Sequence, residues 1–297
     1  MKQLKIQFLF IFSLLIVINS SAQLLDPKKG SLFADQPFFN HIFVKTAKIK
    51  RIVGEYSFKK VGEPIKASKE YYAIEFDESG RMVSSEETRK NDGTKDNNWV
   101  FYTYSDSDQI VAIKKGKKES LAGKEFHYTK QGICDEETTF VALDKNGVHT
   151  KEILYSETIK INLAPNKLQR IYFNNYALPY LTETTILDSN GRTIEKIEEF
   201  TVSQQAITTH YTYSEKGNVV AIKKINSEQA NASEEIRFQY DEFGNVTEQL
   251  TYKNGDMVTE ISYLYNAKTH FLVNLIQRDV ATNSLVLLRF QPYEFYF

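Results

Sequence analysis

Residues 235–252, EIRFQYDEFGNVTEQLTY, contain two stretches of alternating side chains with a short polar turn between them. Successive side chains of a β-strand point to opposite sides of the sheet, so every second residue shares a face. Before the turn, the residues that share a face are Ile236, Phe238 and Tyr240. After the turn, they are Val246, Glu248, Leu250 and Tyr252. This pattern predicts a β-hairpin.

The turn of this hairpin has a defined chemistry. Asp241 can accept hydrogen bonds from main-chain amides two or more residues further on, and Gly244 can adopt the left-handed conformation that closes a type I turn with a bulge. The structural turn residues predicted in this way are Asp77 with Gly80, Asp144 with Gly147, Asp188 with Gly191, Asp241 with Gly244, and Gly217 after Ser214. The acidic residues could instead be scattered calcium ligands. Calcium needs several oxygen atoms at one point, so we interpret these residues as turn-forming.

Similar hairpins recur along the chain. Their anchors are Phe76, Tyr104, Tyr128, Leu187, Tyr213, Tyr240 and Tyr265, which lie 24–28 residues apart except for one gap of 59 residues. We assign that gap to an additional unit near Tyr155 whose sequence no longer shows the anchor and turn residues of the repeat. The short motifs YTYS (at 102 and 211) and VAIKK (at 111 and 220) recur at the same separation of 109 residues. Tandem β-hairpin repeats of this kind predict an all-β protein with a long, curved antiparallel sheet.

The composition also favours β-structure and restricts the function. The chain has 18 Tyr and 20 Phe but only 6 Pro, and aromatic side chains suit a half-buried pleated surface. Its formal net charge of −1 gives no reason to expect nucleic acid or an anionic membrane as a partner. Cys134 is the only cysteine, so stability cannot depend on an internal disulfide.

The N-terminus has the pattern of a secretory signal peptide. Lys2 and Lys5 precede an apolar run, and the small residues Ser20 and Ala22 follow it. We therefore predict a signal peptide at 1–22 that is cleaved between Ala22 and Gln23, with an uncleaved anchor as the alternative. Residues 23–47 are predicted to be a lead-in that caps the first exposed edge, and residues 48–297 a single repeat domain.

These repeats carry a resemblance to a known family. The unit YDEFGNVTE at 240–248 resembles the YD repeat of the Rhs family, and FDESGRMV, LDSNGRTI and YSEKGNVV are looser versions of it. The similarity covers most of residues 54–270, and the SSAQ ending of the N-terminal run is similar to secreted proteins of Bacteroidetes bacteria. This resemblance implies a repeat β-sheet at the cell envelope or surface. It does not imply the enclosed toxin domain of large Rhs proteins, because the chain is too short to enclose one.

No motif for catalysis, metal binding or cofactor binding is present, so no catalytic residue, cofactor or metal is predicted. His127 and Cys134 could form a thiolate–imidazole pair across a hairpin, but we interpret them as a strand histidine and a small buried cysteine. The acidic run EKIEEF (195–200) could supply glycosidase carboxylates, and the basic run KKGKK (114–118) could bind phosphate or lipopolysaccharide. We interpret both runs as solvated strand faces.

An outer-membrane barrel is an alternative architecture, because Tyr293, Phe295 and Phe297 alternate at the end of the sequence. Such barrels need an apolar outer band on every strand, whereas many strands here carry charges, so we prefer the curved sheet.

The sequence therefore predicts an exported, non-catalytic, monomeric repeat protein without stable membrane insertion. It would present an aromatic-rich sheet to a glycan or an envelope protein, because Tyr rings stack on sugars and offer a hydroxyl group. An envelope-associated carboxylate hydrolase, or a structural or secretion-accessory protein without a small ligand, is the alternative.

Overall fold

The computed structural model describes residues 23–26, 32–33, 36–88, 97–145, 148–228 and 232–297. Within these ranges the chain forms a short helix, α1 (His41–Thr46), followed by eighteen strands. The strands are β1 (Ile49–Lys59), β2 (Lys66–Phe76), β3 (Met82–Thr88), β4 (Asn97–Tyr104), β5 (Ile110–Lys117), β6 (Ser120–Tyr128), β7 (Cys134–Lys145), β8 (Val148–Ala164), β9 (Lys167–Phe173), β10 (Pro179–Leu187), β11 (Thr193–Phe200), β12 (Ala206–Tyr213), β13 (Val219–Asn226), β14 (Ser233–Tyr240), β15 (Val246–Lys253), β16 (Asp256–Tyr265), β17 (Leu272–Asp279) and β18 (Leu285–Phe295).

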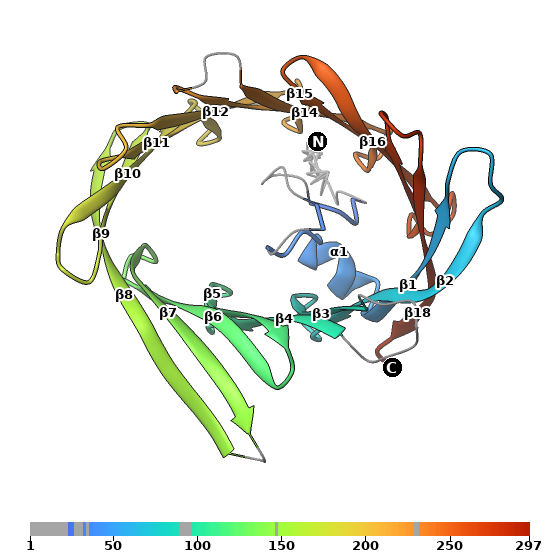
Figure 1. Ribbon diagram of the computed structural model, residues 1–297, viewed down its shortest axis with the longest axis horizontal. Helices are drawn as coiled ribbons and strands as arrows, with labels where there is room; N and C mark the ends of the chain where they lie inside the picture. The colour runs from blue at the N-terminus through green and yellow to red at the C-terminus, as the bar shows by residue number, and fades with distance from the viewer. Residues whose placement is uncertain (1–22, 27–31, 34–35, 89–96, 146–147, 229–231) are drawn as a thin grey trace, which may run out of the picture.

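The strands form one closed antiparallel barrel (Figure 1). Each strand pairs with the next along the chain, and β18 pairs with β1 from Ile49 opposite Phe295 to Lys59 opposite Leu285. The prediction of an all-β fold is confirmed, but the prediction of a long open sheet is wrong. Both edges of such a wide sheet carry unpaired main-chain groups, and the twist of the sheet brings the edges together so that they satisfy each other.

A β-bulge precedes each of the seven anchors identified in the sequence. The register shifts fall immediately before Phe76, Tyr104, Tyr128, Leu187, Tyr213, Tyr240 and Tyr265. A bulge adds one residue to one strand of a pair and increases the local twist. The repeated bulge therefore supplies curvature in the same place in each of these seven units, next to the turn.

This bulge changes which side chains share a face in the strand after the turn. Val246 lies opposite Tyr240 and is fully buried, whereas Leu250 lies opposite Arg237. Tyr252 lies on the same side as Arg237, whose guanidinium is 4.6 Å from the Tyr252 ring centre. The predicted shared face of Val246, Leu250 and Tyr252 is wrong, because the extra residue shifts the alternation by one position.

The tyrosine anchors connect neighbouring repeat units. Each anchor hydroxyl donates a hydrogen bond to a main-chain carbonyl of the preceding unit, two residues after the positive-φ residue of that unit's turn. The pairs are Tyr104 with Met82, Tyr128 with Ile110, Tyr213 with Thr193, Tyr240 with Val219, and Tyr265 with Val246. Tyr293 of β18 is not one of the seven anchors, but it makes the same bond to Leu272. Neighbouring repeat units are therefore joined by a series of side-chain to main-chain hydrogen bonds along one end of the barrel, which we call the tyrosine ladder.

The unit whose sequence lacks the anchor and turn residues corresponds to β8 and β9. These strands join through a tight turn in which Asn166 has a φ of 55°. Tyr155 lies within β8, opposite Thr139 of β7, and is not an anchor next to this turn. The strands β7 and β8 are longer than their neighbours, with 12 and 17 residues, which accounts for the wide gap between anchors.

The N-terminal segment lies inside the ring of strands, where Figure 1 shows α1. Phe33 contacts rings from distant parts of the wall, with centroid distances of 6.0 Å to Tyr72, 6.5 Å to Tyr263 and 6.0 Å to Phe290. Asn40 caps α1 by accepting hydrogen bonds from the amides of residues 42 and 43. The segment therefore fills part of the barrel interior with apolar side chains, and β18 pairs with the β1 edge that it was expected to cover.

In β1–β5 and β12–β18, side chains that pack with this segment in one apolar cluster define the inner face, and the positions between them face outward. Charged pairs at outward positions include Arg51 with Glu75 (3.6 Å), His210 with Glu195 (3.2 Å) and Arg278 with Glu260 (2.7 Å). The described residues contain no helix that is long and apolar enough to cross a membrane.

Candidate binding pocket inside the barrel

A pocket of about 490 Å³ lies between the N-terminal segment and the inner wall of β3–β6. On the side of the N-terminal segment it is lined by Asp26, Gln36, Pro37, Phe39 and His41. On the wall side it is lined by Arg81, Met82, Tyr104, Asp108, Gln109, Ile110, Ile113, Phe126 and Tyr128. The polar groups therefore come mainly from the turns and the N-terminal segment, and the apolar groups mainly from the strands.

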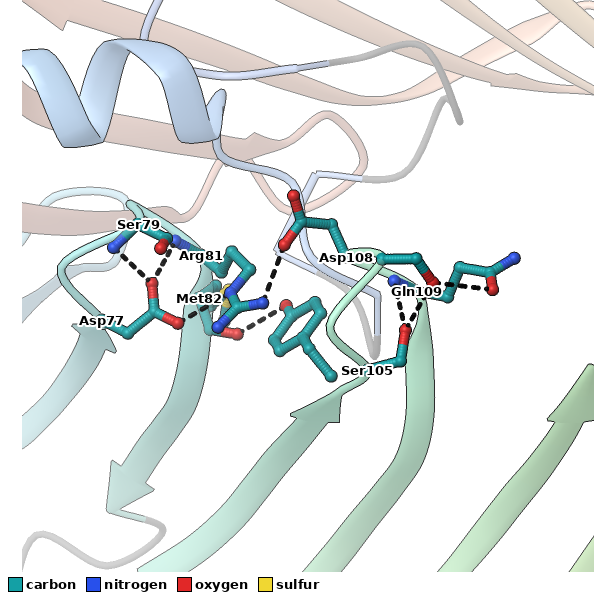
Figure 2. A network of polar contacts seen from close by, with 9 residues as sticks. Asp77, Ser79, Arg81, Met82, Ser105, Asp108 and Gln109 are labelled. Carbon is teal, nitrogen blue, oxygen red and sulfur yellow. Dashed lines mark hydrogen bonds and ion pairs between the residues drawn. The ribbon is translucent and has the colours of Figure 1, made fainter. Parts of the chain in front are cut away.

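Arg81 is held in place by two carboxylates and an aromatic ring. Its Nε lies 2.7 Å from Asp77 Oδ2 and its Nη1 lies 2.8 Å from Asp108 Oδ1, and Figure 2 shows both contacts. The guanidinium also lies 4.9 Å from the centre of the Tyr104 ring. The hydrogen bond from Arg81 to Asp77 is the main cause that raises the pKa of Arg81.

Asp108 occupies the turn position where five other repeat turns have Gly, namely Gly80, Gly132, Gly191, Gly217 and Gly244. Its φ is 60°, and Asp is one of the few residues that tolerate this left-handed conformation. In return, the unit gains a carboxylate at the pocket rim that reaches Arg81 of the neighbouring turn. Gln109 follows and donates a 2.8 Å hydrogen bond from Nε2 to the carbonyl of Gly132. These three side chains link three successive turns, and Figure 2 shows the link between the first two.

The floor of the pocket is aromatic and aliphatic. Ile113 and Phe126 occupy inner positions of β5 and β6, and both line the pocket. Tyr104 and Tyr128 are fixed by hydrogen bonds of 2.7 Å from their hydroxyl groups to main-chain carbonyls. Burial is the first cause that raises the pKa of both tyrosines, so they remain neutral donors.

The inner wall beyond the pocket is charged. Lys124 of β6 lies 2.7 Å from Glu137 of β7. Glu183 of β10 lies between two cations, 2.6 Å from Arg170 Nη1 and 2.7 Å from Lys196 Nζ. Burial opposes ionisation of Glu183, but the hydrogen bonds and charges of Lys196 and Arg170 outweigh it and lower its pKa.

Glu183 on this charged wall is not a candidate for the general acid of the hydrolase alternative. A glycosidase general acid needs a carboxyl group with a raised pKa, and the pKa of Glu183 is shifted in the opposite direction. The acidic run 195–200 is divided between the two faces of β11. Glu195 lies opposite His210 on the outer face, while Glu198 lies opposite Glu183 on the inner face.

Except for Asp144 and Gly147, the predicted turn residues lie at the same end of the barrel as the pocket, but none of those that the structure describes lines it. The carboxylate of Asp77 accepts hydrogen bonds from the amides of Ser79 and Arg81, and Asp188 and Asp241 accept equivalent bonds. The positive φ angles are 81° at Gly80, 76° at Gly191, 84° at Gly217 and 86° at Gly244. Asp144 instead lies within β7, opposite His149, and Gly147 lies outside the described residues.

The structure separates His127 from Cys134. His127 Nδ1 lies 2.6 Å from Asp135 Oδ1, whereas Cys134 lies opposite Tyr128 and its Sγ donates to the carbonyl of Glu136. Burial is the first cause that raises the pKa of Cys134 to about 11, so the group is a thiol at neutral pH. Among the described residues, no three His, Cys, Asp or Glu side chains converge on a metal site.

The basic run 114–118 is divided between the two faces of the barrel wall and the turn that follows β5. Lys114 Nζ lies 6.0 Å from the ring centre of Phe140, and Lys118 Nζ lies 5.8 Å from that of Trp99. The run begins near the end of β5 and continues into the turn to β6, so its lysines lie on both faces of the strand and in the turn.

Sequence reasoning missed the pocket residues. Arg81 and Arg192 each follow a turn Asp by four positions, and each lies over the tyrosine anchor of the next unit. This Asp-x-x-x-Arg spacing was a usable signal. No signal in the sequence linked Phe39 or His41 to residues of β3–β6, because that contact depends on the N-terminal segment lying inside the barrel.

Comparisons with known proteins assign no family. No protein-family model matches the chain, and no curated protein matches it. Similar solved structures include a porin-like protein from Bacteroides vulgatus (11% identity, TM-score 0.33, 80% of this chain and 97% of the other). They also include a porin-like protein from Bacteroides uniformis (8%, 0.39, 84% and 97%) and a LolA superfamily protein from Nitrosomonas europaea (7%, 0.19, 85% and 91%). Similarity at this level transfers no function.

The resemblance to Rhs YD repeats is wrong. The described residues close into a single eighteen-stranded barrel, not into a long curved sheet of repeats. The misleading pattern has a local cause. An Asx turn followed by a left-handed Gly favours a tight, bulged hairpin for local reasons, so this pattern by itself does not identify a family.

Proposed function

We propose that the protein is an exported, non-catalytic binding protein that takes a glycan into the pocket between the N-terminal segment and β3–β6. The observation that carries this proposal is the composition of the pocket. Its volume of about 490 Å³ lies within the usual range of small-molecule sites. A sugar ring offers apolar C–H faces for Phe126 and Tyr128, and hydroxyl groups for Asp108, Gln109 and His41.

The location of the pocket favours a glycan over an envelope protein as the ligand. It lies inside the barrel, between two parts of the same chain, where an oligosaccharide fits more readily than a folded surface. The tyrosine hydroxyl groups are already bonded to the main chain, so the rings are fixed before a ligand arrives. Fixed rings reduce the entropy that is lost on binding.

The proposed location is outside the cytoplasm, without stable membrane insertion. The signal-peptide pattern at 1–22 and its cleavage before Gln23 lie outside the described residues and support export on sequence grounds only. Charged pairs on the outer face, such as Arg237 with Glu235 at 2.6 Å, support a barrel wall in water, because a lipid-facing wall would bury these charges in hydrocarbon.

The two copies of the VAIKK motif allow one substitution inside the pocket to be compared with the equivalent substitution outside it. Ile113 and Ile222 occupy the same position of the repeated motif, but only Ile113 lines this pocket. We expect Ile113→Phe to fill the pocket and abolish binding of soluble oligosaccharides measured by calorimetry. Ile222→Phe should leave binding intact, although both substitutions add the same volume and should cost roughly 1–3 kcal/mol of stability.

Two results would contradict the proposal. One is that the folded wild-type protein binds no member of a broad panel of envelope and host oligosaccharides. The other is that a glycan binds equally well to the Ile113→Phe and wild-type proteins, because the binding site would then lie elsewhere.

A further inference from the structure

One part of the barrel wall has an open strand edge. Strand β8 pairs with β7 from Val148 to Thr158, but it pairs with β9 only from Thr158 to Ala164. Among the residues that the structure describes, β7 is therefore the only strand paired with residues 148–157 of β8. Figure 1 shows β7 and β8 as a hairpin that projects away from the ring.

The side chains of this edge are exposed and partly apolar. All six side chains from Thr150 to Tyr155 are exposed, and they include Ile153 at 60%, Leu154 at 51% and Tyr155 at 41%. An exposed strand edge with unpaired main-chain groups and apolar side chains is a template for another strand. This edge carries a bulge at Leu154 and the charges of Lys151 and Glu152, so a partner strand has to match both features.

We propose that this edge pairs with the same edge of a second copy, so that the protein forms a two-fold symmetric dimer through antiparallel β8–β8 pairing. An antiparallel pair of identical strands is self-complementary, as an isologous interface requires. The choice of a second copy rests on the side chains that this pairing places opposite one another.

The bulge in β8 at Leu154 limits the register. The pairing of β8 with β7 puts Lys151 and Ile153 on one face, and Glu152 and Tyr155 on the other. In an antiparallel pair, residues that lie opposite one another point to the same face of the sheet. Two registers of the β8–β8 pair satisfy this condition for the residues before and after the bulge. In the first, Ile153 lies opposite Leu154 of the second copy. In the second, Ile153 lies opposite Ser156 of the second copy.

Charge decides between the two registers. The second register places Glu152 opposite Glu157, and like charges directly opposite one another destabilise a sheet. The first places Glu152 opposite Tyr155 and Lys151 opposite Ser156, and it brings Ile153 and Leu154 together at the two-fold axis. Each polar side chain then has a partner that can hydrogen-bond, and the apolar side chains leave water together.

Sedimentation velocity of the mature full chain tests the proposal. We expect the wild-type protein to form a dimer in a concentration-dependent manner. Ile153→Lys should convert it to a monomer, because two charges would meet at the axis. The matched control is Leu163→Lys on the same strand: Leu163 is 68% exposed, but it lies where β8 is already paired with β9. This variant should remain dimeric.

A cross-linking experiment reports the contact directly. In a Cys134→Ser background, a mixture of Ile153→Cys and Leu154→Cys chains should form a disulfide-linked dimer under mild oxidation. A mixture of Ile153→Cys and Leu163→Cys chains should not. A wild-type protein that stays monomeric at all concentrations would overturn the proposal. A dimer that persists in a folded Ile153→Lys variant would also overturn it. Pairing of this β8 edge with a different protein, but never with a second copy, would overturn it as well.

Discussion

The guanidinium group of Arg81 lies 4.9 Å from the centre of the Tyr104 ring, which belongs to the next hairpin along the barrel. Arg192 repeats this relationship with Tyr213 at 4.6 Å, and each arginine also pairs with the Asp four residues before it. Each contact joins two neighbouring hairpins through side chains at the turn end of the barrel. The two copies differ in their surroundings, because Arg81 also reaches Asp108 and lines the pocket.

Replacing either arginine should weaken the barrel. Arg81→Ala and Arg192→Ala each remove a cation–π contact and a partly exposed ion pair, so we expect each to lower the free energy of unfolding by about 1–2 kcal/mol. Lysine should restore only part of the loss, because it lacks the planar group that stacks on the ring. Urea denaturation of the four variants measures the effect. Equal stability of wild type and Arg192→Ala would show that the contact is not stabilising.

Gly80 and Gly191 separate backbone strain from steric clash. Both have positive φ angles, 81° and 76°, so alanine at either position should cost about 1–2 kcal/mol. A Cβ at Gly80 would also lie 2.1 Å from the carbonyl oxygen of His41 and 2.6 Å from the amide nitrogen of Lys45, whereas a Cβ at Gly191 would meet no atom within 4 Å.

We therefore expect Gly80→Ala to cost about 1–3 kcal/mol more than Gly191→Ala, as overpacking of a fixed site typically does. Thermal unfolding followed by circular dichroism gives the comparison. If both variants lose the same stability, α1 is not packed against this turn as the structure shows.

Removing a single hydroxyl oxygen from the tyrosine ladder should lower the free energy of unfolding. Tyr265 donates a 2.9 Å hydrogen bond from its hydroxyl group to the carbonyl of Val246, and Val246 is fully buried. Tyr265→Phe leaves this carbonyl without its side-chain donor, and we expect a cost of about 1–2 kcal/mol. Tyr176→Phe is the control, because the Tyr176 side chain is 78% exposed. A negligible loss for Tyr265→Phe would mean that water replaces the missing donor.

The charged inner wall should make stability depend on pH in the acid range. The pKa of Glu183 is lowered below its ordinary value of 4.5, because Lys196 and Arg170 favour the carboxylate more than burial opposes it. A lowered folded-state pKa stabilises the protein above the unfolded-state value, and this contribution disappears as the pH falls through the folded-state value.

We therefore expect Glu183→Gln to be less stable than wild type at pH 7, and the difference to shrink as the pH falls below about 4.5. Chemical denaturation at several pH values measures this difference. The exposed Glu199, on the outer face of β11, supplies the control variant Glu199→Gln. A difference between wild type and Glu183→Gln that is independent of pH would contradict the assigned ion pairs.

The local structure of this protein could be read from its sequence because it depends on near neighbours. The alternation in 235–252, the Asp241 and Gly244 turn and the repeated motifs predicted strands, hairpins and their period, and the structure contains strands at these positions. The pocket could be predicted only in part. Tyr104 and Tyr128 were recognised as anchors, but Arg81 and Asp108 become a site only when successive turns lie side by side.

The sequence by itself determined an all-β chain of bulged hairpins with inward tyrosines, because turn chemistry and a two-residue side-chain period act over a few residues. Only the tertiary structure decided that β1 meets β18 and that the N-terminal segment lies within the ring. It also decided that Leu250 faces outward. The physical reason is cumulative geometry. Closure depends on the summed twist and stagger of eighteen strands, and one extra residue at a bulge reverses the faces of all residues that follow in that strand.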